Sequence, residues 1–217
     1  MTRLLRPSGD TGVSLAELLV AMMVLGLLLT MTGGFVVSAY RANATNTTVD
    51  RSTRSASLAM AEMARMVRAA STYDPPGGGT AQAPFVSIAS DEVTLYAYVN
   101  LDDALEKPVK VQFKVEGTKL VERKWASTPS TSNPDLYVFS PTVTSTVVLT
   151  DALLPVAQRG PTLFTYLKAD RATPATAVAD VAAVRIDLQV GTGADLGRST
   201  FLTNTVGVTN VASQGTP

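Results

Sequence analysis

The chain has 217 residues, 46% of them hydrophobic, and it carries 18 basic and 18 acidic side chains. This length suits one membrane helix and one further domain of ordinary size, and it is too short for two large domains. The sequence contains no cysteine and no histidine, which excludes disulfides, thiol nucleophiles, Ser-His relays and imidazole metal ligands.

A polar N-terminal stretch precedes a long apolar segment. Arg3 and Arg6 lie in the polar stretch, and no charged residue occurs from Leu18 to Tyr40. As a helix, this segment would span roughly 35 Å, enough to cross the hydrocarbon core of a bilayer. The sequence therefore predicts a transmembrane helix at residues 13–40. The two arginines favour a cytoplasmic N-terminus and an exported C-terminus.

Glu17 stands at the start of this apolar segment. Inserting a lone carboxylate into the bilayer costs about 2.5–3.5 kcal/mol on insertion scales. One interpretation is an interfacial glutamate that reaches into the headgroups. The other is that a partner of opposite charge meets Glu17 at a later stage.

The string from Gly12 to Met22, GVSLAELLVAM, resembles the processing and assembly motif of type IV prepilins and pseudopilins. The resemblance implies that residues 1–12 are a leader peptide, that prepilin peptidase cuts after Gly12, and that the new amine of Val13 is N-methylated. It also implies that Glu17 pairs with the N-terminal ammonium of a neighbouring subunit. Phe or Met is commoner in the family at the position of Val13.

A second processing site is an alternative. Val37-Ser38-Ala39 resembles an ordinary signal peptidase site, and cleavage there would release a secreted binding module. A removable signal has an apolar region of roughly 7–15 residues, whereas the apolar segment here is longer. Glu17 is also unexpected in such a signal, so we favour the retained helix.

Residues 41–73 have the pattern of an amphipathic helix that continues the membrane helix. Small and apolar residues recur at helical spacing in this stretch, and we expect the methionines among them to pack rather than to bind metal. The Pro-Pro and Gly-rich stretch at 74–84 then predicts a linker. The apolar positions are Ala56, Ala59, Met60, Met63, Ala64, Val67 and Ala70, with Met66 beside them.

Residues 85–217 are predicted to form a β-rich domain. Apolar residues alternate with polar ones at 93–99 and at 109–115, and Glu116-Gly117 predicts a turn into a strand at 119–125. The fold class is therefore α+β, with a long N-terminal helix packed on antiparallel sheet, as in the pilin-like fold. The hairpin and the late strands resemble minor pilins of the PilW and PulJ type. Further strand candidates are 136–140, 142–149, 163–167, 182–190 and 199–208.

No pattern in the sequence predicts a catalytic site, a metal site or a cofactor. The group Asp102, Asp103 and Glu106 is typical of a turn, with calcium binding as the weaker alternative, and Asp151 and Asp187 belong to no metal or paired-carboxylate framework. Lysines 107, 110, 114 and 119, with Arg123 and Lys124, make the hairpin locally basic. We interpret them as a solvated strand face rather than a DNA-binding site, and Tyr96, Tyr98 and Trp125 as packing residues.

The expected function is that of a non-enzymatic minor subunit of a type IV pilus or a type II secretion pseudopilus. Its expected partners are other pilin or pseudopilin subunits, prepilin peptidase, the inner-membrane assembly platform and membrane lipid. The expected location is the inner membrane, as a single-pass protein, and then a fibre at the cell surface. The alternatives are a secreted or membrane-anchored binding module and a membrane-anchored hydrolase.

Overall fold

The structure is a computed structural model that describes residues 13–77, 79–99, 107–159, 162–191 and 199–209. It has one long helix, α1 (Leu15–Arg68), followed by strands and one short 3-10 helix, η1 (Val178–Asp180). This confirms the α+β class with an apolar N-terminal helix and antiparallel sheets. The strands are β1 (Phe85–Ala89), β2 (Glu92–Tyr98), β3 (Pro108–Glu116), β4 (Lys119–Trp125), β5 (Ser127–Pro129), β6 (Tyr137–Phe139), β7 (Ser145–Thr150), β8 (Phe164–Leu167), β9 (Ala183–Val190) and β10 (Thr200–Gly207).

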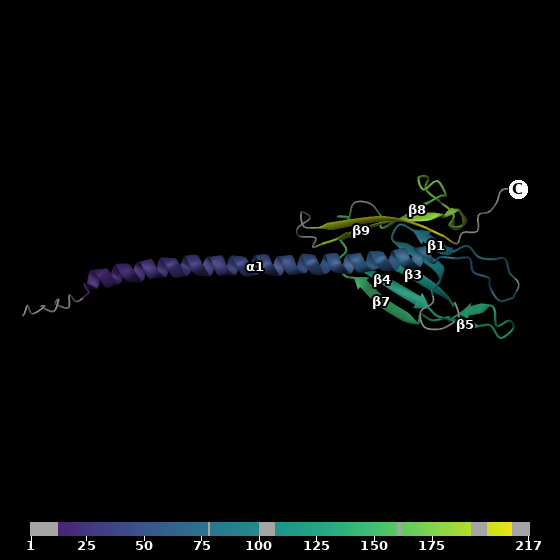
Figure 1. The fold of residues 1–217 in the computed structure, drawn as a ribbon, viewed down its shortest axis with the longest axis horizontal. Helices are drawn as coiled ribbons and strands as arrows, with labels where there is room; N and C mark the ends of the chain where they lie inside the picture. Colours follow the sequence, from purple (N-terminus) through teal and green to yellow (C-terminus); the bar gives the residue numbers. More distant parts are fainter. Residues whose placement is uncertain (1–12, 78, 100–106, 160–161, 192–198, 210–217) are drawn as a thin grey trace, which may run out of the picture. The chain divides into compact units, whose positions relative to one another are not determined.

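The chain divides into two compact units, one up to Thr48 and one from Val49 onward. The leader, with Gly12, and the acidic group Asp102, Asp103 and Glu106 lie outside the described residues. Each unit is described by itself below. Figure 1 shows the elements along the chain.

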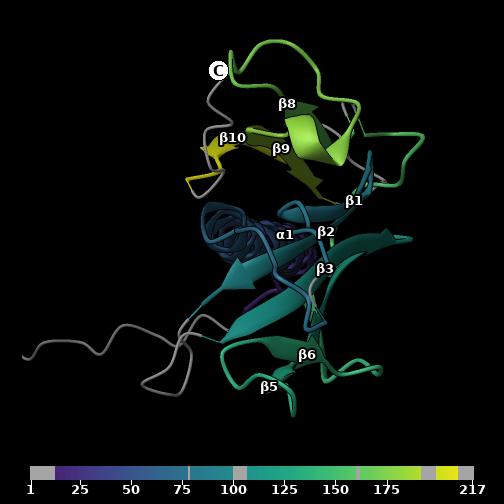
Figure 2. The same cartoon turned by 90° about the vertical axis from the view of Figure 1, so that its right-hand side faces the viewer.

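Two antiparallel sheets enclose the C-terminal part of α1 in the second unit. The larger sheet has the order β1-β2-β3-β4-β7, and the smaller has the order β10-β9-β8. Figure 2 shows α1 end-on between them. Two hydroxyl pairs join the helix to both sheets: Thr53 to Thr200 of β10 and Ser55 to Thr150 of β7, each at 3.0 Å between oxygens.

The buried face of α1 consists mainly of alanine and methionine. Alanine lets the backbones of helix and strand approach closely, and the flexible methionine side chains fill the remaining space. The prediction that these methionines pack in a core is confirmed. The buried residues of α1 are Ala56, Ala59, Met60, Met63, Ala64, Met66 and Val67.

The helix ends at Arg68, earlier than the sequence predicts. The next residues bond to the sheet instead: Tyr98 N–H donates to the Ala69 carbonyl, and Ser71 N–H donates to the Tyr96 carbonyl, at 3.1 and 3.0 Å. Tyr73 pairs with Gln82 through two backbone hydrogen bonds of 3.1 and 2.8 Å. These bonds to β2 and to the segment at 74–84 replace the bonds that another helical turn would make.

The β3–β4 hairpin turns through two residues, because Glu116 pairs with Lys119. Gly117 has a φ of 64°, and Thr118 is not among the positive-φ residues. A positive φ at only the first loop position is typical of a type II′ turn, whose twist matches that of the strands. The predicted turn is therefore confirmed, and it requires glycine at position 117.

Tyr166 of β8 ties the smaller sheet to the larger one. Its buried hydroxyl lies 2.9 Å from the Ala89 carbonyl and 2.8 Å from the Glu92 carbonyl. Burial raises the pKa of Tyr166 well above its ordinary value, so the hydroxyl keeps its proton as a donor.

We expect Tyr166→Phe to lower the free energy of unfolding by about 0.5–1.5 kcal/mol, because it removes the hydrogen bonds of the hydroxyl to the Ala89 and Glu92 carbonyls. The measurement is urea denaturation of the full chain in detergent micelles, followed by the fluorescence of Trp125, the single tryptophan. An unchanged midpoint would contradict this role of the hydroxyl.

Candidate functional site

The first unit consists of a helix whose apolar side chains are uncovered. From Val13 to Ala44 every described residue is exposed, including the leucines, methionines and valines of the apolar segment. The part of α1 near the N-terminus is long and apolar enough to cross a membrane. A soluble helix with this surface would be penalised by water, so lipid or another chain must cover it.

The polar side chains of this segment satisfy themselves within the helix. Thr30 Oγ1 donates to the Gly26 and Leu27 carbonyls, at 3.1 and 2.8 Å, and Thr32 Oγ1 donates to the Leu28 carbonyl at 2.7 Å. A hydroxyl bonded in this way enters hydrocarbon without an unpaired donor. The threonines are therefore compatible with a membrane span.

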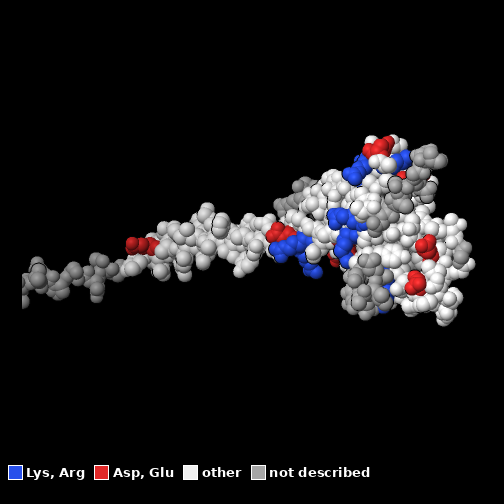
Figure 3. Space-filling view, turned by 45° about the vertical axis from the view of Figure 1, so that its right-hand side comes forward, with Lys and Arg blue, Asp and Glu red and all other residues white. Residues whose placement is uncertain are grey.

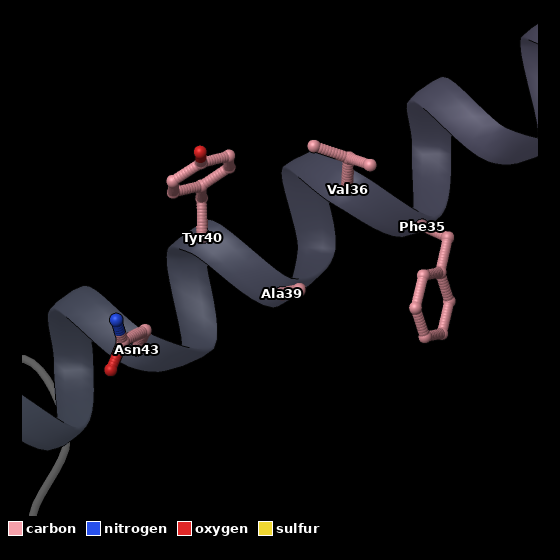
Figure 4. A pocket seen from close by; sticks show the side chains of 5 residues that line it. All are labelled: Phe35, Val36, Ala39, Tyr40 and Asn43. Carbon is pink, nitrogen blue, oxygen red and sulfur yellow. The ribbon is translucent and has the colours of Figure 1, made fainter.

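A shallow groove lies on the helix surface near the end of the apolar segment. Figure 4 shows Phe35 pointing to one side of the helix and Val36 and Tyr40 to the other, with the short side chain of Ala39 between them. Asn43 completes the lining. The groove is almost wholly apolar, as expected for a surface that meets lipid tails or a second helix.

Glu17 lies in the first turn of α1. The helix begins at Leu15, so Ser14 holds the N-cap position, and its carbonyl accepts hydrogen bonds from the N–H groups of Glu17 and Leu18 at 2.9 and 3.1 Å. Ser-x-x-Glu at these positions is the capping-box pattern, in which the glutamate can reach back to the N-cap N–H. The partial positive charge of the helix N-terminus also favours a carboxylate there.

No cation of the described residues pairs with Glu17, whose side chain is exposed. The next basic residue along α1 is Arg41, which lies roughly 36 Å further along the helix axis. Val13, the predicted new N-terminus, is exposed beside the start of the helix. The structure thus places Val13 and Glu17 at one end of an apolar helix, and it leaves the carboxylate available to another molecule.

A second charged group lies where α1 meets β4. Lys124 Nζ contacts Glu62 Oε1 at 3.2 Å and Glu122 Oε2 at 3.0 Å, and Arg65 forms a two-pronged ion pair with Glu62. Burial opposes ionisation of Glu62, but the hydrogen bonds from Arg65 and Lys124 outweigh it and lower the pKa. Burial dominates at Glu122, whose pKa is raised and whose Oε1 atom has no hydrogen-bond partner.

The raised pKa of Glu122 predicts a pH dependence of stability. An unfolded glutamate loses its proton near its ordinary pKa of 4.5, while the folded protein keeps this proton to higher pH. Stability therefore falls as pH rises from about 4.5 through the folded pKa. We expect Glu122→Gln to remove this fall in the free energy of unfolding, measured by urea denaturation from pH 4.5 to 7. Glu116→Gln, at an exposed position of the same hairpin, should keep it, and equal slopes in both variants would contradict the account.

Several of the remaining acids and bases of the second unit pair with each other. Asp187 is buried and accepts from Arg185 at 2.9 Å and from Thr203 at 2.8 Å, while Asp151 is exposed. Among the described residues no three acidic side chains are arranged to hold a metal ion.

Several basic residues of the β3–β4 hairpin are also engaged. Lys114 pairs with Glu92 at 2.9 Å, Arg123 pairs with Glu116 at 2.6 Å, and Lys110 lies over the ring of Trp125, 4.6 Å from its centroid. Figure 3 shows basic and acidic groups interspersed on one face of the domain. This pattern gives no continuous basic stripe on that face.

Tyr73, Tyr96 and Phe139 form an aromatic cluster that the sequence did not predict. The Tyr73 and Tyr96 rings lie 4.7 Å apart, and Phe139 lies 4.8 and 5.2 Å from them. Tyr96 is buried and donates to Gln82 at 2.7 Å, so its prediction as a packing residue is confirmed. Only the fold brings the three rings together, because they come from segments far apart in sequence.

No protein-family model matches this chain, and no curated protein matches it.

Proposed function

We propose that this chain is a minor structural subunit of a type IV pilus or a type II secretion pseudopilus. In this proposal prepilin peptidase removes residues 1–12, and Val13 becomes the N-methylated first residue. The apolar part of α1 first anchors the subunit in the inner membrane, with the β domain outside. It then packs with other subunits in the fibre.

The observation that carries the proposal is the unpaired carboxylate at the start of an uncovered apolar helix. Glu17 has no cationic partner among the described residues, and the helix from Leu18 to Tyr40 is exposed. If copies or relatives of this helix pack side by side, they cover its apolar surface and also bring an N-terminal ammonium to Glu17. A carboxylate and an ammonium in a low-dielectric layer attract each other strongly, while either alone is penalised.

The C-terminal half of α1 supports the same interpretation. One face of it, from Ala56 to Val67, is buried against the sheets, and this part of α1 therefore belongs to the core of the folded domain. In a fibre the assembly platform and the other subunits would hold the apolar segment. The β domain would remain free for contacts with other minor subunits or with exported cargo.

Two alternative functions, a secreted binding module and a membrane-anchored hydrolase, would require different features of this chain. A secreted binding module would require cleavage after Ala39, which discards the helix start and Glu17. A membrane-anchored hydrolase would require acids that converge in a cleft, and the described acids near one another, Glu62 and Glu122, share Lys124 between helix and sheet.

The direct test is the location of the chain after fibres are sheared from cells. We expect quantitative mass spectrometry to find it in the fibre fraction in small amounts relative to the main subunit, and in the membrane fraction. A chain found only as a soluble protein in the medium, or only in membranes, would overturn the proposal.

A further inference from the structure

One face of α1 in the second unit is left uncovered by the sheets. Figure 2 shows the two sheets above and below the helix. The residues of the uncovered face recur at intervals of three and four, the spacing that puts side chains on one side of a helix. This set, called the arginine face below, consists of Arg51, Arg54, Leu58, Ala61, Arg65 and Arg68.

Most charges of the arginine face are not balanced within the chain. Arg51, Arg54 and Arg68 are exposed, and no acidic side chain of the described residues pairs with them. Arg65 pairs with Glu62 at 2.8 Å, but 41% of its side chain remains exposed. A guanidinium group stays charged and has five donors, so this face can bind several carboxylates.

The middle of the arginine face is apolar. Leu58 is 72% exposed, more than any other large apolar side chain described in the second unit. Ala61 is also exposed, and its small side chain allows another backbone to approach closely. An exposed leucine with a pair of arginines on each side resembles a protein interface, in which apolar contacts lie at the centre and charged groups at the rim.

We propose that the arginine face binds an amphipathic helix of a different protein, whose contact surface is apolar at the centre and acidic at both ends. Helices that pack side by side touch through residues spaced three and four apart, as these are. The contact would run from Arg51 to Arg68, roughly 26 Å along the axis. It does not depend on the proposed function, because it rests on the second unit alone.

A second copy of this chain does not fit the arginine face. From Arg51 to Arg68 the order along this face is two arginines, Leu58, Ala61 and two arginines, which is the same in both directions. Whether two copies packed parallel or antiparallel, arginine would therefore face arginine at each end. Such contacts between like charges are unfavourable, so the partner must carry acids at these places.

Acidic residues at the margins of the arginine face favour a narrow partner. With about 100° of rotation per residue, Asp50 lies at one edge of the face and Glu62 at the other, and Asp50 is exposed. A broad anionic surface, such as a bilayer of anionic phospholipids, would meet these acids together with the arginines. A helix about 10–12 Å across can contact the face between them, and only an apolar partner surface would cover Leu58.

Photo-cross-linking in the native cells tests this partner. The photo-reactive amino acid p-benzoylphenylalanine would replace Leu58 in the full chain, and mass spectrometry would identify the peptide that irradiation joins to it. We expect a peptide of a different protein with acidic residues at helical spacing on both sides of the joined residue. Adding Arg54→Glu, or separately Arg51→Glu, should lower the yield at least about fivefold. Replacing the opposing acids of the partner by lysine should restore it.

Two controls separate this contact from general attraction to anions. Lys119→Glu makes the same change of charge at an exposed position of β4 and should leave the yield unchanged. The same photo-reactive residue in place of Val156, which is 66% exposed outside α1, should not join that peptide. The proposal would be overturned by no link at position 58, by a link there to lipid, to another copy or to residues 102–106 of the same chain, or by a yield that both glutamate variants leave unchanged.

Discussion

Glu17→Ala is expected to reduce incorporation of the chain into fibres by at least about tenfold, while its amount in the membrane fraction stays unchanged. The reason is that, in the fibre we propose, the variant would leave the ammonium of a neighbouring subunit buried without a counter-charge. Removing one partner of a buried ion pair costs about 3–5 kcal/mol. The measurement is quantitative mass spectrometry of sheared fibres and of membranes from the same cells.

Glu17→Gln is the matched control, because it separates charge pairing from helix capping. Glutamine supports a capping box as glutamate does, but it carries no charge. If the ion pair drives assembly, the glutamine variant fails as the alanine variant does. Normal incorporation of Glu17→Gln beside a defective Glu17→Ala would show that Glu17 acts by capping α1, and it would contradict the intersubunit pair.

Phe113→Ala is expected to lower the free energy of unfolding of the β domain by about 3–5 kcal/mol. Phe113 is fully buried in β3 and belongs to the core that α1 shares with the sheets. Removing its ring leaves a cavity that the neighbouring strands cannot close completely. Urea denaturation in detergent micelles, followed by Trp125 fluorescence, measures the loss.

Phe201→Ala provides the comparison for this substitution. Phe201 lies on β10 and is 51% exposed, so the same chemical change should cost much less than in the core, by at least about 2 kcal/mol. Equal losses for the two variants would show that the core does not lie between α1 and the sheets as described.

Alternation of apolar and polar residues was enough to predict most strands. It located the β3–β4 hairpin with its turn and the late strands β9 and β10. It missed β1 and β5, because β1 lies directly after the Pro/Gly-rich stretch and β5 has only three residues. The alternation also predicted that β2 is half-buried, but Val93 to Ala97 are all buried. Both faces of β2 are covered in the fold, and the sequence pattern of one strand does not show which other elements pack against it.

Features that depend on tertiary contacts could not be predicted. The end of α1 at Arg68 results from backbone bonds to β2, which local sequence does not specify. In the sequence Glu122 is one of several charged residues of its strand, and only the folded structure buries it and so raises its pKa. By contrast, the sequence was enough to propose Glu17 as a candidate site residue, because Glu17 is a single acid at the start of an uncharged segment.

The mature N-terminus tests the central claim most directly. The chain would be isolated from native membranes, with and without the host's prepilin peptidase, and analysed by intact mass and terminal peptide sequencing. The account predicts a chain that starts at N-methylated Val13 only when the peptidase is present. A start at Tyr40, or a chain that keeps its leader in both strains, would contradict it.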